Sequence, residues 1–127
     1  MYEYKKHKSI PKTKRLIVYA KCTHRCAYCG CELEYKDMQI DHIIALNSGI
    51  IMEDEESDNI KNLLPSCRQC NFYKQTFTVE QFRQRIQETM INNLRKQFIY
   101  KLAVKYGLIE EHNKPITFYF ERVEHND

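Results

Sequence analysis

The pattern of apolar and polar positions predicts a helix near the start of the chain. Within residues 12–21, Leu16, Ile17 and Ala20 recur at helical spacing. The unbroken apolar run in the same segment would also suit a strand, so helix is the favoured of two interpretations. Residues 1–11 before it are polar and basic without a period, which is typical of a terminal arm.

Two short strands are predicted in the middle of the chain. Residues 38–46 are a candidate strand, in which successive side chains point to opposite faces. His42 would then lie on one face and Asp41 on the opposite face. A second strand is expected around residues 60–64 and would stop at Pro65. The long acidic loop between the two strands shows no regular pattern.

The second half of the chain is predicted to be mostly helical. One helix should run over residues 67–75, and Thr78 followed by Gln81 is a capping-box signature for another. An apolar stripe spaced by four residues would drift around a straight helix, which favours a break near Asn92 and Asn93. Gly107 would then end the last helix. The stripe consists of Phe82, Ile86, Met90, Leu94, Phe98, Leu102 and Tyr106.

Alternating apolar residues near the C-terminus predict a final strand over residues 115–123. With 127 residues the chain has the length of one domain. We therefore expect a single α+β domain with its core at 22–78, a basic arm at 1–11, and a helical extension at 79–107 before the final strand. No apolar run approaches the roughly 20 residues of a membrane span, and the N-terminus lacks a secretory pattern, which favours a cytoplasmic protein.

Charge is distributed unevenly along the sequence. The net charge is +3, but residues 1–31 carry +7, residues 32–59 carry −8, residues 60–106 carry +7 and residues 107–127 carry −3. Basic segments suit a polyanion such as nucleic acid, and an excess of carboxylates suits a metal site or a solvated loop. For any single run, a solvated face is an equally good interpretation.

Six cysteines include two CxxC pairs, Cys26 with Cys29 and Cys67 with Cys70. In a reducing compartment such pairs favour metal ligation over disulfides. Four thiolates satisfy Zn²⁺ tetrahedrally and leave no open position, so a zinc ion bound there would be structural. Other ligand sets remain open, because three further residues could also bind the ion: Cys22, Cys31 and His24. Two identical CxxC spacings make the two pairs the simpler assignment.

A second pattern lies between and just after the cysteine pairs. It consists of Asp41 followed by His42, then Asn62, and then Asn71 directly after the second pair. In this order, together with the cysteines, these residues resemble the HNH nuclease family, whose fold is the ββα-metal fold, over about residues 26–74. The resemblance implies a metal-dependent endonuclease that hydrolyses phosphodiester bonds in DNA and leaves 5′-phosphate and 3′-hydroxyl ends.

The resemblance also implies a role for each residue. Asp41 and Asn71 would hold one catalytic Mg²⁺ or Mn²⁺, His42 would be the general base, Asn62 would brace the loop or the histidine, and Lys74 would face phosphate. The chemistry agrees with these residue types. Hard cations prefer oxygen ligands, and a neutral imidazole can accept a proton from water near neutral pH.

Phosphate contacts are expected from the basic segments, and six side chains are candidates: Lys12, Lys14, Arg15, Lys74, Arg83 and Arg85. One active site cuts one strand at a time, so a double-strand break would need a homodimer or a second encounter. Two alternatives remain open at this stage. One is a non-catalytic zinc module that binds nucleic acid or protein, and the other is a protein–protein adaptor built on the helices at 79–106.

Three positions depart from the residues usual in the family. Ala45 stands where proline often occurs, Ile50 where a second glycine is common, and Gln75 where glycine is usual. None of the three removes a proposed ligand. They bear on the geometry of the loops around the site.

Overall fold

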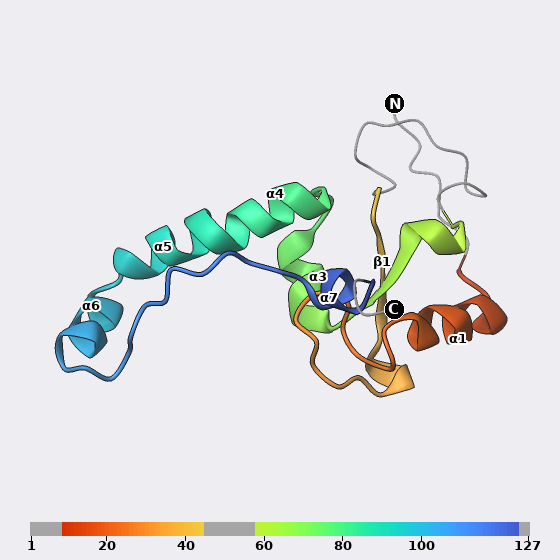
Figure 1. Ribbon diagram of the computed structural model, residues 1–127, viewed down its shortest axis with the longest axis horizontal. Helices are drawn as coiled ribbons and strands as arrows, with labels where there is room; N and C mark the ends of the chain where they lie inside the picture. The colour runs from red at the N-terminus through yellow and green to blue at the C-terminus, as the bar shows by residue number, and fades with distance from the viewer. Residues whose placement is uncertain (1–8, 45–57, 125–127) are drawn as a thin grey trace, which may run out of the picture. The chain divides into compact units, whose positions relative to one another are not determined.

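The computed structural model describes residues 9–44 and 58–124, and Figure 1 shows their elements. Their contacts divide the chain into two compact units, where the sequence had indicated one. Unit 1 spans residues 1–78 and 118–127, and unit 2 spans residues 79–117. Ala45 and Ile50 lie outside the described residues. Among the helices that the structure describes, none is long and apolar enough to cross a membrane.

Unit 1 begins with the predicted N-terminal helix, α1 (Lys12–Lys21). The side chain of Val18 in this helix is buried. At its last residue, the Nζ atom of Lys21 donates to the carbonyl oxygens of Ile60 and Leu63, at 2.7 Å each. These two bonds fasten the end of α1 to the segment that enters the second strand.

The centre of unit 1 is a ββα unit, which confirms the expected α+β fold class. Strand β1 (Gln39–His42) pairs antiparallel with β2 (Leu63–Ser66), and helix α3 (Arg68–Lys74) follows directly. In the register of the pair, Asp41 lies opposite Leu64 and His42 opposite Leu63. The side chain of Asp41 is buried and that of His42 is half-buried, as alternation along a strand predicts.

The second strand differs from the prediction, because it contains Pro65 instead of ending before it. Residues Ile60–Asn62 form a 3₁₀ turn, η2, and the strand starts only at Leu63. The carbonyl oxygen of Pro65 accepts a hydrogen bond from the amide of Ala27 at 2.8 Å, so the polar edge of this residue faces away from β1. A proline on that edge removes no hydrogen bond between the two strands.

The prediction of a C-terminal strand over residues 115–123 is wrong. Residues Tyr119–Glu124 form a helix, α7. The amide of Phe118 donates to Oε1 of Glu121 at 2.8 Å, which is a side-chain cap at the start of a helix. The first two amides of α7 donate to carbonyl oxygens of Tyr28 and Ala27. In a strand, these backbone amides would need a neighbouring strand as their acceptor. In α7, carbonyl oxygens of the segment around the first cysteine pair accept from them instead.

Gly30 explains how α7 can pack so closely on that segment. Its φ angle is +79°, which favours glycine, and a Cβ atom there would lie 3.3 Å from Cδ2 of Tyr119. The ring of Phe118 also meets the ring of Tyr28 edge to face, with centroids 5.1 Å apart. The chain therefore returns to unit 1 at its C-terminal end and packs against the first cysteine pair.

Unit 2 is helical, as predicted, but its helices are divided at a different place. Its elements are α4 (Val79–Gln84), the π-helical segment η3 (Arg85–Met90), α5 (Ile91–Arg95) and α6 (Phe98–Lys105). The wider turn of a π-helix suits an apolar stripe spaced by four residues, so the chain does not break near Asn92. The break comes after Arg95, and Gly107, with a φ of +73°, ends α6 as expected.

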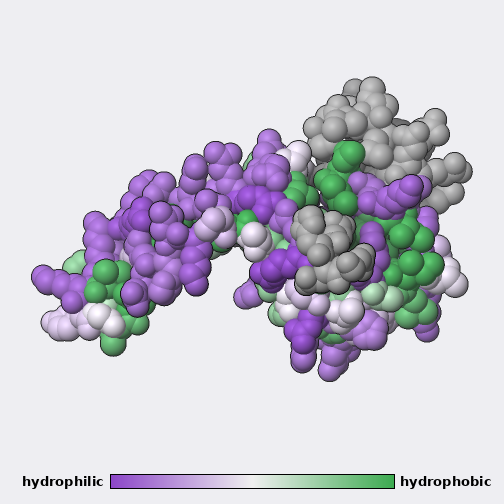
Figure 2. All heavy atoms as spheres, in the orientation of Figure 1, coloured by the Kyte–Doolittle hydropathy of each residue, from purple (hydrophilic) through white to green (hydrophobic). Residues whose placement is uncertain are grey.

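The surface of unit 2 is mostly hydrophilic along α4 and α5, with apolar side chains gathered at α6 (Figure 2). Phe98 and Ile99 are both largely exposed there. At the surface of the same unit, Glu111 accepts hydrogen bonds from Arg95 and from the hydroxyl of Tyr100. These contacts tie the segment after α6 back to the end of α5.

Candidate metal centre and catalytic site

Four cysteines converge in unit 1. The Sγ atoms of Cys26, Cys29, Cys67 and Cys70 all lie within 4.8 Å of one another, and those of Cys29 and Cys67 are 3.8 Å apart. Four sulfur atoms held tetrahedrally at 2.3 Å from a zinc ion lie about 3.8 Å from one another. The cluster can hold a metal ion, and its dimensions fit zinc.

Hydrogen bonds within the cluster favour the thiolate form of one cysteine. The hydrogen bond with Cys70 lowers the pKa of Cys26 to about 4, and the same interaction raises the pKa of Cys70. Because the thiolate is the form that binds metal, Cys26 is ready for ligation at neutral pH. Desolvation, followed by the hydrogen bond with Cys29, raises the pKa of Cys31 to about 12. Cys31 therefore remains a neutral thiol.

The other candidate ligands are placed elsewhere. Cys22 is buried and Cys31 is exposed, and neither belongs to the cluster of four. The ring of His24 stacks on the ring of Tyr19, with centroids 4.1 Å apart and planes 6° from parallel. The structure thus groups the two CxxC pairs and no alternative set among the described residues.

Helix α3 begins inside the cysteine cluster. Cys67 is its N-cap residue, and the Sγ atom of Cys67 accepts a hydrogen bond from the amide of Cys70 at 3.4 Å. The same short helix carries Asn71 and Lys74. Any ion held by the four thiolates therefore also fixes the start of the helix that carries Asn71 and brings Lys74 to β1.

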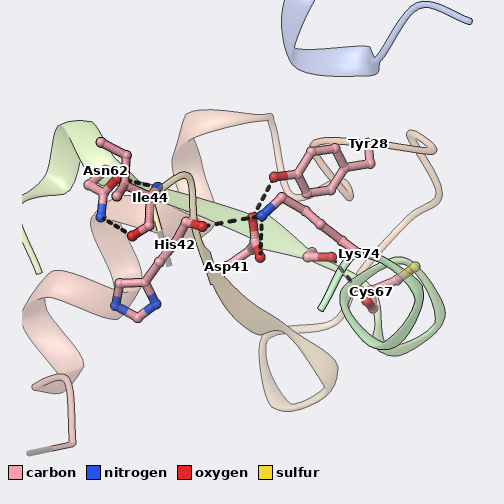
Figure 3. Close-up of polar contacts among 8 residues, drawn as sticks. Tyr28, Asp41, His42, Ile44, Asn62, Cys67 and Lys74 are labelled. Atoms are coloured by element: carbon pink, nitrogen blue, oxygen red, sulfur yellow. Dashed lines mark hydrogen bonds and ion pairs between the residues drawn. The ribbon is translucent and has the colours of Figure 1, made fainter. Parts of the chain in front are cut away.

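The carboxylate of Asp41 is buried between a tyrosine and a lysine, as Figure 3 shows. The hydroxyl of Tyr28 donates to Oδ2 at 2.5 Å, and Nζ of Lys74 lies 3.1 Å from the same oxygen and 3.3 Å from Oδ1. Burial raises the pKa of Asp41, against the lowering effects of Tyr28 and Lys74. Burial and the charge of Asp41 raise the pKa of Tyr28, so the hydroxyl remains a donor.

His42 lies on the other face of β1 and contacts a second aspartate. Its Nε2 atom is 2.9 Å from Oδ1 of Asp58, and both side chains are 15% exposed. In Figure 3 the imidazole points away from the carboxylate of Asp41, as the alternation of the strand predicts. The two neighbours in sequence thus offer two separate chemical groups on opposite faces.

Asn62 holds the backbone directly after His42. Its Oδ1 atom accepts from the amide of Ile44 at 2.8 Å, and its Nδ2 atom donates to the carbonyl of Ile44 at 3.2 Å (Figure 3). Its own carbonyl accepts from the amide of Ile43 at 2.8 Å. These contacts fix the backbone of residues 43 and 44.

Lys74 does not face phosphate in this structure, contrary to the prediction. Its side chain has no exposed surface, and Nζ also donates to the carbonyl of His42 at 3.3 Å. The physical reason is the burial of Asp41, because a charged carboxylate away from water requires a counter-charge. Asn71 lies one turn before Lys74 and is half-buried. Residues three apart share a face of a helix, so Asn71 belongs to the side of α3 that meets β1.

The other predicted phosphate contacts divide between the two units. On α1 of unit 1, Lys12 is exposed and Lys14 is half-exposed, whereas Arg15 donates to the carbonyl of Met38 at 3.2 Å. In unit 2, the guanidinium of Arg83 bonds to Glu80 and to the carbonyl of Ile116, and Arg85 lies in the π-helical segment. The side chains best placed to meet solvent are those of Lys12 and Lys14.

Sequence reasoning missed two residues of the site, Tyr28 and Asp58. Tyr28 lies within the first CxxC pair, and a buried tyrosine hydroxyl usually needs a partner, which is the signal that could have pointed to it. Asp58 is 16 residues from His42 at the end of an acidic loop. No spacing rule links those two positions.

Comparison with known proteins identifies the family of this segment. Residues 26–76 match the model of the HNH endonuclease family. The match contains both strands, α3 and the four clustered cysteines. The chain carries an HNH domain. The match concerns this segment alone.

One solved structure shares the fold, the crystal structure of the Type II-C Cas9 enzyme from Actinomyces naeslundii. The likeness covers 80% of this chain, with 21% sequence identity and a TM-score of 0.50. The chain spans 11% of the length of that protein. At this identity the likeness concerns the fold alone. No curated protein matches the chain significantly.

Proposed function

We propose that this protein is a metal-dependent endonuclease that hydrolyses phosphodiester bonds in DNA, with His42 as its general base. One observation carries the proposal. Within an HNH domain, a partly exposed imidazole and a carboxylate that binds a positive charge occupy adjacent positions of β1. Hydrolysis of a phosphodiester needs both a base for water and positive charge near the phosphate.

The general base is the role for which His42 is best placed. It lies at the end of β1, where Asn62 fixes the following backbone through two hydrogen bonds to Ile44. A neutral imidazole in a partly exposed position can take a proton from water at neutral pH. In the proposed reaction, one water hydrogen moves to the imidazole while the water oxygen attacks phosphorus.

Asp41 and Asn71 are the residues that would hold Mg²⁺ or Mn²⁺. The fit is supported by the ammonium of Lys74, which stands in for a cation against the carboxylate of Asp41 and the carbonyl of His42. When bound, the ion supplies charge stabilisation at the phosphate and the leaving oxygen. Because Lys74 occupies the oxygens of Asp41, ammonium and metal ion compete for the same charge.

We propose zinc as the ion of the four-cysteine cluster, with a structural role. The spacing of the sulfur atoms fits a tetrahedral zinc, and four thiolates leave no position open for water or substrate. The helix that starts at Cys67 carries Asn71, so zinc would order the second ligand of the catalytic ion. Soft thiolates and hard oxygen ligands select different ions, which keeps the two sites distinct.

A non-catalytic zinc module is the second candidate, favoured by one observation. The carboxylate of Asp41 is already satisfied by Tyr28 and Lys74, so the fold can exist without a metal ion there. Such a module could still bind nucleic acid through Lys12 and Lys14.

The experiment that separates the two functions uses the zinc-loaded full chain. Supercoiled plasmid, single-stranded DNA and RNA are incubated with Mg²⁺, with Mn²⁺ and without added divalent ion. An endonuclease converts the plasmid to nicked circles only with the ion, and linear product would indicate a second cut, made by a dimer or in a second encounter. Binding of DNA without cleavage in either ion would support the non-catalytic module.

A further inference from the structure

We propose that Asp58 is a positioning residue for His42, which directs the Nδ1 atom of the imidazole toward the attacking water. The inference rests on the proposed function, because it names the group that orients the general base. It starts from the contact between Nε2 of His42 and Oδ1 of Asp58 at 2.9 Å.

The direction of this hydrogen bond defines the role of each ring nitrogen. An ionised carboxylate only accepts, so Nε2 must carry the hydrogen, and the lone pair of the neutral ring is then on Nδ1. Both side chains are 15% exposed. A hydrogen bond to a charged group in this partly desolvated position is stronger than the same bond between fully exposed side chains.

The turn before β2 holds Asp58 in place. The side chain of the next residue, Asn59, accepts from the amide of Lys61 at 3.0 Å, and the carbonyl of Asn59 accepts from the amide of Asn62 at 2.7 Å. Asn62 in turn bonds both polar groups of the Ile44 backbone. Residues 58–62 therefore fix the histidine twice, once through its ring and once through the backbone that follows it.

The contact also stabilises the charge that forms during the reaction. As the water oxygen bonds to phosphorus, one water hydrogen moves to Nδ1 and the ring becomes an imidazolium. The bond from phosphorus to the leaving oxygen breaks, and that oxygen takes up a proton from solvent. The carboxylate of Asp58 accepts the hydrogen bond from Nε2–H, as in other sites where an aspartate orients a histidine base.

A double-mutant cycle on the zinc-loaded full chain tests the proposal. Asp58→Ala should lower the single-turnover cleavage rate by about 10²-fold through misplacement of the base, with DNA affinity and metal requirement unchanged. In the His42→Ala background the same substitution should have no further effect, because residues that act as a unit are not additive. Asp58→Glu, which keeps the carboxylate, should recover part of the rate. Asp37→Ala, at an exposed aspartate, is the matched control.

Two kinetic outcomes would overturn the inference. An equal rate loss from Asp58→Ala in both backgrounds would show that Asp58 acts independently of His42. Recovery of the rate of Asp58→Ala at high metal concentration would make Asp58 a metal ligand instead.

Nuclear magnetic resonance tests the contact without any cleavage. With ¹⁵N-labelled, zinc-loaded protein and no DNA, we expect a protected Nε2–H signal from His42 that is lost in Asp58→Ala. A signal that persists unchanged in the variant contradicts the proposal. A wild-type protein that shows the signal but cuts no nucleic acid would refute the proposed function while leaving the contact intact.

Discussion

The Nζ atom of Lys74 lies 3.1 Å from Oδ2 of Asp41, and both side chains are almost entirely buried. Each charge has lost most of its hydration and depends on the other for compensation. The pair also joins α3 to β1, so it links the helix that begins in the cysteine cluster to the strand that carries His42. The fold thus contains its own cation beside the carboxylate that we propose as a ligand of the catalytic metal ion.

Lys74→Met should destabilise the protein, because it leaves the carboxylate of Asp41 buried without its cation. Removal of one partner of a buried ion pair costs about 3–5 kcal/mol at neutral pH. The free energy of unfolding of the zinc-loaded protein measures this cost. Lys12→Met, at an exposed lysine of α1, should change it by less than about 0.5 kcal/mol.

The cost of Lys74→Met should also depend on pH. Burial already raises the pKa of Asp41, and loss of Lys74 raises it further. For a carboxyl with a raised pKa, the stability contributed by protonation is fully present below the ordinary value of about 3.9 and is lost as pH rises through the raised value. The deficit relative to wild type should therefore grow from pH 5 to pH 8. A deficit that shrinks over this range would contradict the buried charge pair.

Cys67→Ser should lose the metal and much of the thermal stability, because Cys67 is both a member of the cluster and the N-cap of α3. Metal analysis of the purified protein should give one zinc per wild-type chain and less than one in the variant. Cys31→Ser, outside the cluster, should retain full zinc content. If Cys67→Ser folds normally with full zinc, the assigned ligand set is wrong.

Gln75 adopts a φ of +53° and a ψ of −129°, a conformation that favours glycine. Gln75→Gly should therefore raise the free energy of unfolding by about 1 kcal/mol, which denaturant titration can measure. The converse substitution, Gly107→Ala at a φ of +73°, should lower it by about 1 kcal/mol. Equal effects of the same sign would show that the backbone at these positions is not strained as described.

Local signals explain what the sequence could predict. Helical spacing over residues 12–21 identified α1, and two identical CxxC spacings identified the cluster, because both depend on neighbours in the chain. Alternation along β1 also placed Asp41 and His42 on opposite faces. The ββα order followed from these elements and from the family resemblance.

Contacts between distant segments explain what the sequence could not predict. Alternating apolar residues near Phe118 suggested a strand, but the segment around Tyr28 satisfies the backbone amides of α7 and permits a helix. The burial of Lys74 depends on a partner 33 residues away. The contact of His42 with Asp58 similarly arises only when the turn before β2 folds back on β1.

Lys12 and Lys14 should contact phosphate, because Lys12 is exposed and Lys14 half-exposed, whereas Arg15 donates to the carbonyl of Met38. Each phosphate contact contributes about 0.9 to the slope of log affinity against log salt concentration for duplex DNA. The double variant Lys12→Gln/Lys14→Gln should therefore flatten the slope by about 1.8. Lys36→Gln, at an exposed lysine paired with Glu34, serves as control. A slope unchanged in the double variant would move the DNA-binding face away from α1.

The single-turnover rate of plasmid nicking by His42→Ala tests the account most directly. The substitution removes the proposed base but leaves Asp41, Asn71 and the four cysteines in place, so zinc content and DNA affinity should match wild type. The rate at neutral pH should fall on the order of 10²- to 10⁴-fold and recover partly at higher pH, where hydroxide is more abundant. His112→Ala, in unit 2, should cut like wild type. A folded His42→Ala protein that binds zinc and DNA and nicks at the wild-type rate would contradict the mechanism.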